Sequence, residues 1–154
     1  MRILVSACLL GINTRYDGKS SLCAEVLRLA EKHTLVPVCP EQLGGLPTPR
    51  TPCEVQGERA LTETGQDLTE AFQRGAEQAL AIYHLCGCHA AVLKQNSPSC
   101  SKSLLYDGTF RGKLIQGTGM FTAKLLHAGA PVYGEDEAHL IDTPQTPAST
   151  DTET

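Results

Sequence analysis

The chain has 154 residues, of which 41% are hydrophobic and 19% are charged. This length and composition fit one globular domain and exclude wholesale disorder, a coiled coil and a membrane protein. No window approaches the roughly 20 apolar residues of a membrane-spanning helix. The formal net charge of −4 disfavours binding to an intact nucleic acid, because both molecules carry negative charge. The apolar run at the N-terminus is too short for a secretory signal, so we expect a cytoplasmic protein.

Strands and helices alternate in the first half of the chain. Residues 2–6 form a short apolar run typical of a buried strand. A turn-rich loop then leads into apolar residues at helical spacing over 22–30, and residues 34–38 form a second strand. Helix breakers over residues 42–52 predict an ordered loop without regular structure, and residues 54–62 indicate a hairpin.

The second half continues the alternation. Apolar residues at helical spacing over 68–83 predict the clearest helix of the chain. The segments that follow are a strand at 89–93, a polar loop at 94–103, a weaker segment at 106–115, a helix near 120–127 and a short strand at 131–133. We therefore expect a domain over residues 1–140 and, because of its Thr, Pro, Ser and acidic composition, a disordered tail over residues 141–154.

The alternation predicts an α/β fold, a single compact domain with a mostly parallel sheet and helices on both faces in a Rossmann-like, three-layer arrangement. Right-handed crossovers bring the carboxyl ends of parallel strands to one edge. Cys8, Cys39 and Cys100 each lie just beyond the carboxyl end of an expected strand, where open α/β sheets build ligand sites. We therefore expect these three thiols to lie together.

The chain contains seven cysteines, an odd number that excludes a complete set of intramolecular disulfides. Three thiols without a fourth protein ligand suit an iron–sulfur cubane with one open iron, but zinc with three thiolates and a water fits the same donors. In a third interpretation Cys8 is the nucleophile of a phosphatase-like loop, although Arg15 lies one position too far for the C-x5-R spacing. In a fourth the three thiols are only buried. Spacing alone leaves these alternatives open.

Several distinctive blocks follow one another along the chain: SACLLG at 6–11, RYDG at 15–18, VCPEQLGGLPTPR at 38–50, GQDLT at 65–69, and LK at 93–94 with SPSC at 97–100. Together they resemble the signature of the thiouracil desulfidase (TudS) family from Met1 to about Glu137. The resemblance implies a 4Fe-4S cluster held by three cysteines with one iron left open. It makes Cys8, Cys39 and Cys100 the ligands and Glu41 and Ser97 the catalytic neighbours.

The remaining positions match this family less directly. Ser101 stands where the family usually has glycine after the last cysteine. Cys23, Cys53, Cys86 and Cys88 match no ligand position, and we interpret them as bystanders.

The resemblance also implies an activity, the removal of sulfur from a thiolated pyrimidine as hydrogen sulfide. The open iron acts as a soft Lewis acid toward the thiocarbonyl sulfur, and water adds to the ring carbon with Glu41 as general base or acid. No net redox change is required. The expected substrates are thiouracil, a thiouridine or its monophosphate such as 4-thio-UMP. A zinc-dependent hydrolase and a metal- or redox-sensing module without catalysis remain alternatives.

Groups near the same edge of the sheet are candidates for binding this substrate. A 5′-phosphate would find backbone donors and positive charge there. The serine-rich run after residue 96 leaves open which hydroxyl acts at the site. The expected substrate-binding residues are Gly44, Gly45, Arg50, Lys94, Ser99, Ser101 and Lys102.

Overall fold

The computed structural model describes residues 1–142. Its main sheet has four parallel strands in the order β2-β1-β5-β8. Their bounds are Arg2–Ser6 for β1, Thr34–Val38 for β2, Ala90–Leu93 for β5 and Val132–Gly134 for β8. The side chains of Ile3, Leu4 and Val5 in the central strand β1 are 0% exposed, because both faces of a parallel sheet are covered. The expected α/β fold with a parallel sheet is confirmed.

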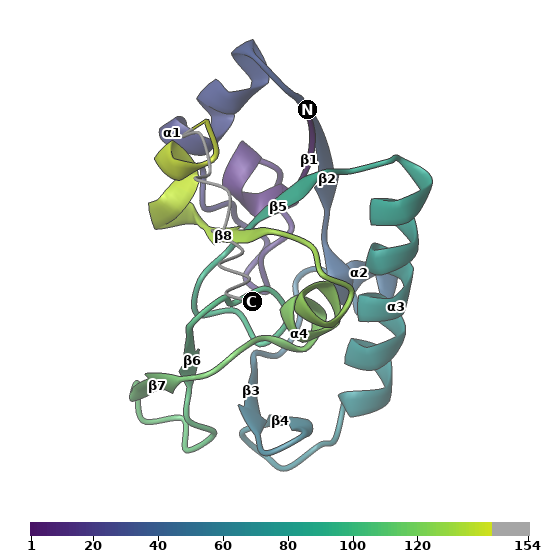
Figure 1. The fold of residues 1–154 in the computed structure, drawn as a ribbon. Helices are drawn as coiled ribbons and strands as arrows, with labels where there is room; N and C mark the ends of the chain where they lie inside the picture. The colour runs from purple at the N-terminus through teal and green to yellow at the C-terminus, as the bar shows by residue number, and fades with distance from the viewer. Residues whose placement is uncertain (143–154) are drawn as a thin grey trace, which may run out of the picture.

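Helices cover the sheet on both faces (Figure 1). Helices α3 (Thr69–Leu85) and α4 (Met120–His127) pack on one face, and α2 (Pro40–Leu43) packs on α3. The other face carries α1 (Ala24–Leu27) and the 3₁₀ helices η1 (Ala7–Leu10), η2 (Arg28–Glu31) and η3 (Glu135–Leu140). Neighbouring residues of one strand point to opposite faces. Leu4 and Leu93 therefore join the first core, whereas Ile3, Val5 and Val92 join the second.

Two antiparallel hairpins extend the fold beyond the sheet. The hairpin expected at 54–62 is present as β3 (Cys53–Gln56) and β4 (Arg59–Thr62). The weaker segment at 106–115 belongs to a second hairpin, β6 (Leu104–Tyr106) and β7 (Leu114–Gln116). β3 contacts β6, and Figure 1 shows both hairpins together at the end of the molecule away from the N-terminus.

Two local expectations differ from the structure. The helix expected over 22–30 is only α1 followed by the 3₁₀ helix η2. The N-cap position of α1 is Cys23, whose side chain makes no cap hydrogen bond. In the second case, helix α2 includes Gln42 and Leu43, where the breaker-rich loop was expected to start. Proline is well suited to the first helical position, which Pro40 occupies.

The described part of the domain reaches beyond residue 140. Ile141 packs into the core of the second face, and Asp142 Oδ1 lies 2.6 Å from His33 Nε2. These two residues, which the sequence placed in the tail, therefore pack against the domain. The rest of the expected disordered tail, residues 143–154, lies outside the described residues. Within residues 1–142 no helix is long and apolar enough to cross a membrane.

Candidate functional site

A cavity of about 570 Å³ lies at the carboxyl edge of the sheet. Cys8 lies in η1 directly after β1, Cys39 joins β2 to α2, and Cys100 follows β5 through a polar loop. All three line the cavity. The parallel sheet therefore brings the three thiols to the same cavity, as strand order alone led us to expect.

The three thiols are buried strongly enough to favour their neutral forms. Burial raises the pKa of Cys8 to about 11; the charge of Lys94 acts against this rise and the charge of Cys39 adds to it. Burial also raises the pKa of Cys39 and of Cys100, and Cys100 responds to the charges of both other thiols. Three thiolates at this place thus need a cationic group between them.

The donor set is suited to a soft metal group. Thiolates bind both iron–sulfur clusters and zinc, and Cys8, Cys39 and Cys100 all line this cavity. As the side chains stand, no group of three or more His, Cys, Asp or Glu within residues 1–142 is arranged to hold a metal ion.

Ser97 shapes the loop that carries Cys100. Its Oγ accepts hydrogen bonds from the backbone N–H of Ser99 at 3.2 Å and of Cys100 at 3.0 Å. A hydroxyl oxygen has two lone pairs and one proton, so both acceptor positions of Ser97 are engaged. Because Ser97 also lines the cavity, its hydroxyl can act toward a ligand only as a donor.

Glu41 lies at the N-terminal turn of α2 and lines the cavity, with 15% of its side chain exposed. Burial raises the pKa of its carboxyl, while the charge and hydrogen bond of Arg50 and the nearby Ser99 hydroxyl act against this rise. Ser99 Oγ is buried and has no hydrogen bond of normal geometry among the described residues. The result is a carboxyl held in place by Arg50 but able to bind a proton more readily than an exposed glutamate.

Arg50 is fully engaged inside the protein. Its Nε donates to Glu41 Oε1 at 3.2 Å. Nη1 donates to the Pro47 carbonyl and to Thr48 Oγ1, and Nη2 donates to the Thr14 carbonyl and to Cys39 Sγ. These five bonds use the five N–H donors of a guanidinium. Arg50 lines the cavity, and within the protein it connects Glu41, Cys39 and the proline-rich loop. Its expected role in binding a substrate phosphate stays a prediction.

Gly44 and Gly45 do not line the cavity. Gly44 packs against α3 so closely that a Cβ atom there would lie 2.0 Å from the carbonyl oxygen of Ala71. The carbonyl of Gly44 accepts a hydrogen bond from Arg74, and a Cβ atom on Gly45 would lie 3.8 Å from the same guanidinium. The backbone N–H groups of Gly44 and Gly45 donate instead to the carbonyls of Pro40 and Gln42.

Ser101 and Lys102 also lie outside the cavity lining. The Ser101 hydroxyl is buried and donates to Gln95 Oε1 and to the Leu104 carbonyl, which shapes the turn after Cys100. Lys102 Nζ lies 2.6 Å from Glu137 Oε1 and 2.9 Å from Oε2. Both side chains therefore make contacts within the protein, away from the cavity.

Lys94 is at the cavity, as expected. Its Nζ donates to the Gln95 carbonyl and to Glu135 Oε1, both at 2.9 Å, so two of its three donors are engaged within residues 1–142. Arg15, which we had not placed in the binding set, lines the cavity as well, and it bonds to Ser21 and Asp17.

Sequence reasoning missed several other residues of the lining. Cys53, interpreted as a bystander, lines the cavity, and burial raises its pKa to about 11. The missed residues also include Tyr16, Glu54, Tyr106 and Phe110. Cys53 and Glu54 follow the proline-rich block directly, which is a signal that could have been used, whereas nothing in the spacing indicates Tyr106 or Phe110.

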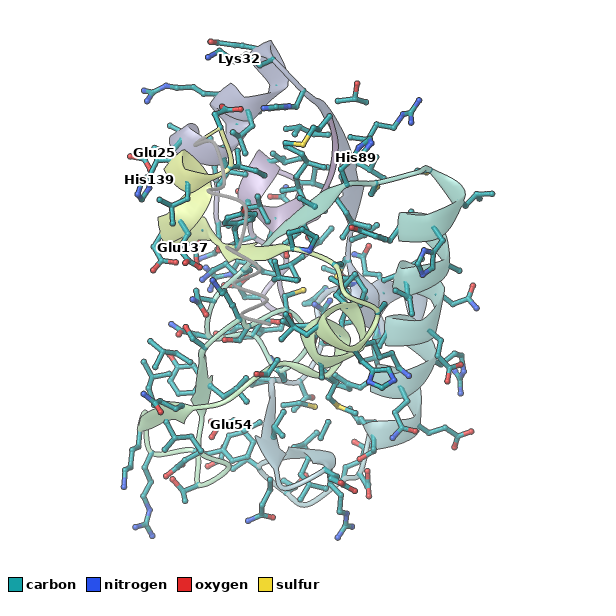
Figure 2. The ribbon with its side chains drawn as sticks, in the orientation of Figure 1. Glu25, Lys32, Glu54, His89, Glu137 and His139 are labelled. Carbon is teal, nitrogen blue, oxygen red and sulfur yellow. The ribbon has the colours of Figure 1, made fainter. Side chains whose placement is uncertain are left out.

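The remaining cysteines lie away from the cavity. Cys23, Cys86 and Cys88 are not among the residues that line it. Cys86 and Cys88 come just before His89, which Figure 2 labels, and before β5, at the opposite edge of the sheet. This placement agrees with their interpretation as bystanders.

Known proteins resemble the chain over most of its length. The model of one family, described as 2-thiouracil desulfurase, matches residues 3–137. The "Uncharacterized protein YbbK" of Bacillus subtilis (strain 168) is 40% identical over 149 residues, which cover 90% of this chain and 99% of YbbK. The solved structure of a [4Fe-4S]-dependent thiouracil desulfidase, TudS, is 45% identical with a TM-score of 0.84, covering 88% of this chain and 91% of that one. The family match includes the three cysteines and both hairpins.

Proposed function

The chain belongs to the 2-thiouracil desulfurase family and is an enzyme of that kind, and from this membership we propose that it hydrolyses a thiolated pyrimidine to the uracil compound and hydrogen sulfide with the help of a [4Fe-4S] cluster. One observation carries the proposal: Cys8, Cys39 and Cys100 line the same cavity as Glu41 and Ser97. The likeness to a [4Fe-4S]-dependent thiouracil desulfidase supports the choice of cofactor.

Cys8, Cys39 and Cys100 are the residues that hold the cluster. When bound, the cluster supplies a soft Lewis-acidic iron suited to a thiocarbonyl sulfur, and its positive iron ions stabilise thiolates that burial alone disfavours. Cys53 lines the same cavity but is not assigned as a ligand, because it matches no ligand position of the family signature.

Glu41 and Ser97 have complementary roles in moving protons. The raised pKa of Glu41 allows its carboxyl to take a proton from the attacking water and to return it to the pyrimidine nitrogen. Ser97, whose Oγ already accepts two backbone hydrogen bonds, donates its proton to an acceptor on the substrate and so orients the ring. Arg50 keeps the carboxyl of Glu41 at the cavity wall.

We favour a nucleoside monophosphate such as 4-thio-UMP over the free base. Lys94 and Arg15 are cationic side chains of the cavity lining, and each lies near the surface, with 25% and 35% of the side chain exposed. Each cation is paired with a carboxylate, Lys94 with Glu135 and Arg15 with Asp17, but within residues 1–142 the third donor of Lys94 remains for a phosphate that stays outside while the ring enters. Free 2-thiouracil or 4-thiouracil would leave this donor without a partner on the substrate.

Anaerobically purified enzyme tests the function directly. Sulfide release and loss of the thiocarbonyl absorbance are measured with 2-thiouracil, 4-thiouracil and 4-thio-UMP. We expect turnover, with 4-thio-UMP the best of the three. Absence of sulfide release from all three compounds contradicts the proposal, whereas faster turnover of a free base contradicts only the preference for a nucleotide.

Two alternatives give different outcomes in the same preparation. A zinc hydrolase would use the same thiols, but the protein would be colourless and would contain zinc in place of iron. A metal- or redox-sensing module would bind its metal and release no sulfide. A brown protein that releases sulfide excludes both.

A further inference from the structure

Three aromatic side chains gather at the cavity and take no part in the hydrophobic cores. The chain has four tyrosines, three phenylalanines and no tryptophan. Phe72, Phe121 and Tyr83 are buried in the cores, and Tyr133 packs against one of them. The remaining aromatic residues all line the cavity: Tyr16, Tyr106 and Phe110.

Phe110 has an unfavourable backbone conformation. Its φ angle is 57°, in the left-handed region that a bulky side chain rarely adopts. Within residues 1–142, Asn96 and Phe110 are the two non-glycine residues with positive φ, and both line the cavity. Asparagine tolerates this region, whereas phenylalanine does not. Strain of this kind is concentrated at ligand sites, and glycine would relieve it at position 110.

Glu54 holds this strained turn in place. Its Oε1 accepts hydrogen bonds from the backbone N–H of Gly108 at 3.0 Å and of Phe110 at 3.1 Å. Gly108 lies against β3, where a Cβ atom would contact the Val55 carbonyl at 3.2 Å. Figure 2 shows Glu54 between the two hairpins, so one carboxylate ties the tip of the β6–β7 hairpin to β3.

We propose that Phe110 stacks on the pyrimidine ring of the substrate and that Glu54 is the positioning residue that holds it there. The inference rests on the proposed function, because it assigns the ring-binding residue of the same cavity. Phe110 is a better candidate than Tyr16, whose ring is already covered by Arg15 with its Cζ 5.8 Å from the ring centroid. Aromatic side chains stack on any nucleobase through its π face, so Phe110 recognises the flat ring while other groups recognise the sulfur.

The test compares KM and kcat for 4-thiouracil and 4-thio-UMP in cluster-loaded variants. Phe110→Ala raises KM about tenfold or more, because stacking on one base is lost, while kcat changes little. Phe110→Tyr keeps the wild-type KM. Phe110→Gly raises KM as Phe110→Ala does but relieves the backbone strain, so its thermal midpoint lies above that of Phe110→Ala. Leu114→Ala is the control, since this residue of the same hairpin is 40% exposed and does not line the cavity.

The role of Glu54 is tested by a double-mutant cycle. Glu54→Ala removes both hydrogen bonds and raises KM. Glu54→Gln retains an acceptor oxygen and restores most of the affinity. Adding Glu54→Ala to Phe110→Ala raises KM no further. A purely structural role would make the two changes additive.

A binding measurement separates stacking from general damage to the site. The wild type binds UMP, the product expected from 4-thio-UMP, more tightly than 5,6-dihydro-UMP, whose ring is not flat, and Phe110→Ala loses this preference in calorimetric titration. Unchanged KM and an unchanged preference in Phe110→Ala overturn the inference. Failure of the wild type to release sulfide from any thiopyrimidine instead overturns the proposed function, so the two failures are distinct.

Discussion

Arg50 holds three parts of the site together through one side chain. Its guanidinium bonds to Glu41, to Cys39 Sγ and to the carbonyl of Thr14, and only 6% of the side chain is exposed. A charged group buried to this extent is stable only when its donors are satisfied, as they are here. The chemistry of Glu41 therefore depends on a residue that does not itself need to touch the substrate.

Glu41→Gln separates proton transfer from cluster binding. Glutamine has nearly the same shape and can still accept from Arg50, but it cannot exchange a proton. We expect full iron content and a loss of about 10²-fold or more in kcat. Sulfide release by the iron-loaded variant gives the answer, and wild-type turnover would mean that Glu41 has only a structural role.

Arg50→Lys tests whether Arg50 positions Glu41. A lysine keeps the charge but has three donors in place of five. Because Arg50 lowers the pKa of Glu41, we expect weaker pairing to move the Glu41 limb of the pH–rate profile to higher pH and to lower kcat about tenfold. An unchanged pH profile would show that the pair is not what sets the proton affinity of Glu41.

Helix α2 is placed by an unusually close contact with α3. A Cβ atom on Gly75 would lie 1.8 Å from the carbonyl oxygen of Pro40 and 3.0 Å from the backbone nitrogen of Gly44. Because α2 begins one residue after Cys39 and contains Glu41, this contact sets the positions of the proposed ligand Cys39 and of the Glu41 carboxyl together. Gly119 has a similar role, since a Cβ atom there would lie 2.4 Å from the Ser99 carbonyl oxygen, beside Cys100.

Gly75→Ala measures the energy of this contact. Alanine favours a helix by about 1 kcal/mol over glycine, but the added methyl group cannot fit unless the backbone of α2 moves, and overpacking typically costs about 1–3 kcal/mol or more. We expect the clash to prevail, with a thermal midpoint several degrees lower and reduced iron content. Gln78→Ala, at an exposed position of the same helix, is the control. A thermal midpoint of Gly75→Ala above that of the wild type would contradict the clash expected between α2 and α3.

The ion pair between Lys102 and Glu137 ties the loop after Cys100 to η3. Burial raises the pKa of Glu137, but the Gly134 N–H and Lys102 outweigh it, so the pKa lies below the ordinary 4.5. A carboxyl with a lowered folded-state pKa stabilises the fold above its unfolded pKa and loses that contribution as the pH falls through the folded one. Glu137→Gln therefore lowers the thermal midpoint at pH 6, and the difference from wild type shrinks below about pH 4.5. A difference that does not depend on pH would exclude the charge as its cause.

At the scale of the whole molecule, the parts predicted well are those set by local pattern and by the handedness of parallel crossovers. The strands at 2–6 and 34–38 and the helix over 68–83 have clear apolar periods, and their order brings Cys8, Cys39 and Cys100 to one edge. The substrate side of the cavity was predicted less well. Phe110 and Glu54 meet through a hairpin contact across 56 residues of chain, and no local pattern reports such a contact.

The predicted substrate-binding residues show the same limit of sequence reasoning, because here it named residues that packing engages elsewhere. Gly44, Arg50 and Lys102 have the right chemistry and lie near the right edge in sequence, yet their donors or their space are taken by neighbours from distant elements. Sequence indicates which groups are available, whereas packing decides which of them remain for a ligand.

The central claim, that three particular thiols hold the cluster, is tested most directly by iron and acid-labile sulfide content in two matched variants. Cys100→Ala and Cys53→Ala each remove one buried thiol from the same cavity. After anaerobic purification, Cys100→Ala should be depleted of both iron and sulfide, and Cys53→Ala should keep the wild-type content. Wild-type iron in Cys100→Ala, or its loss in Cys53→Ala, would contradict the assignment of the ligands.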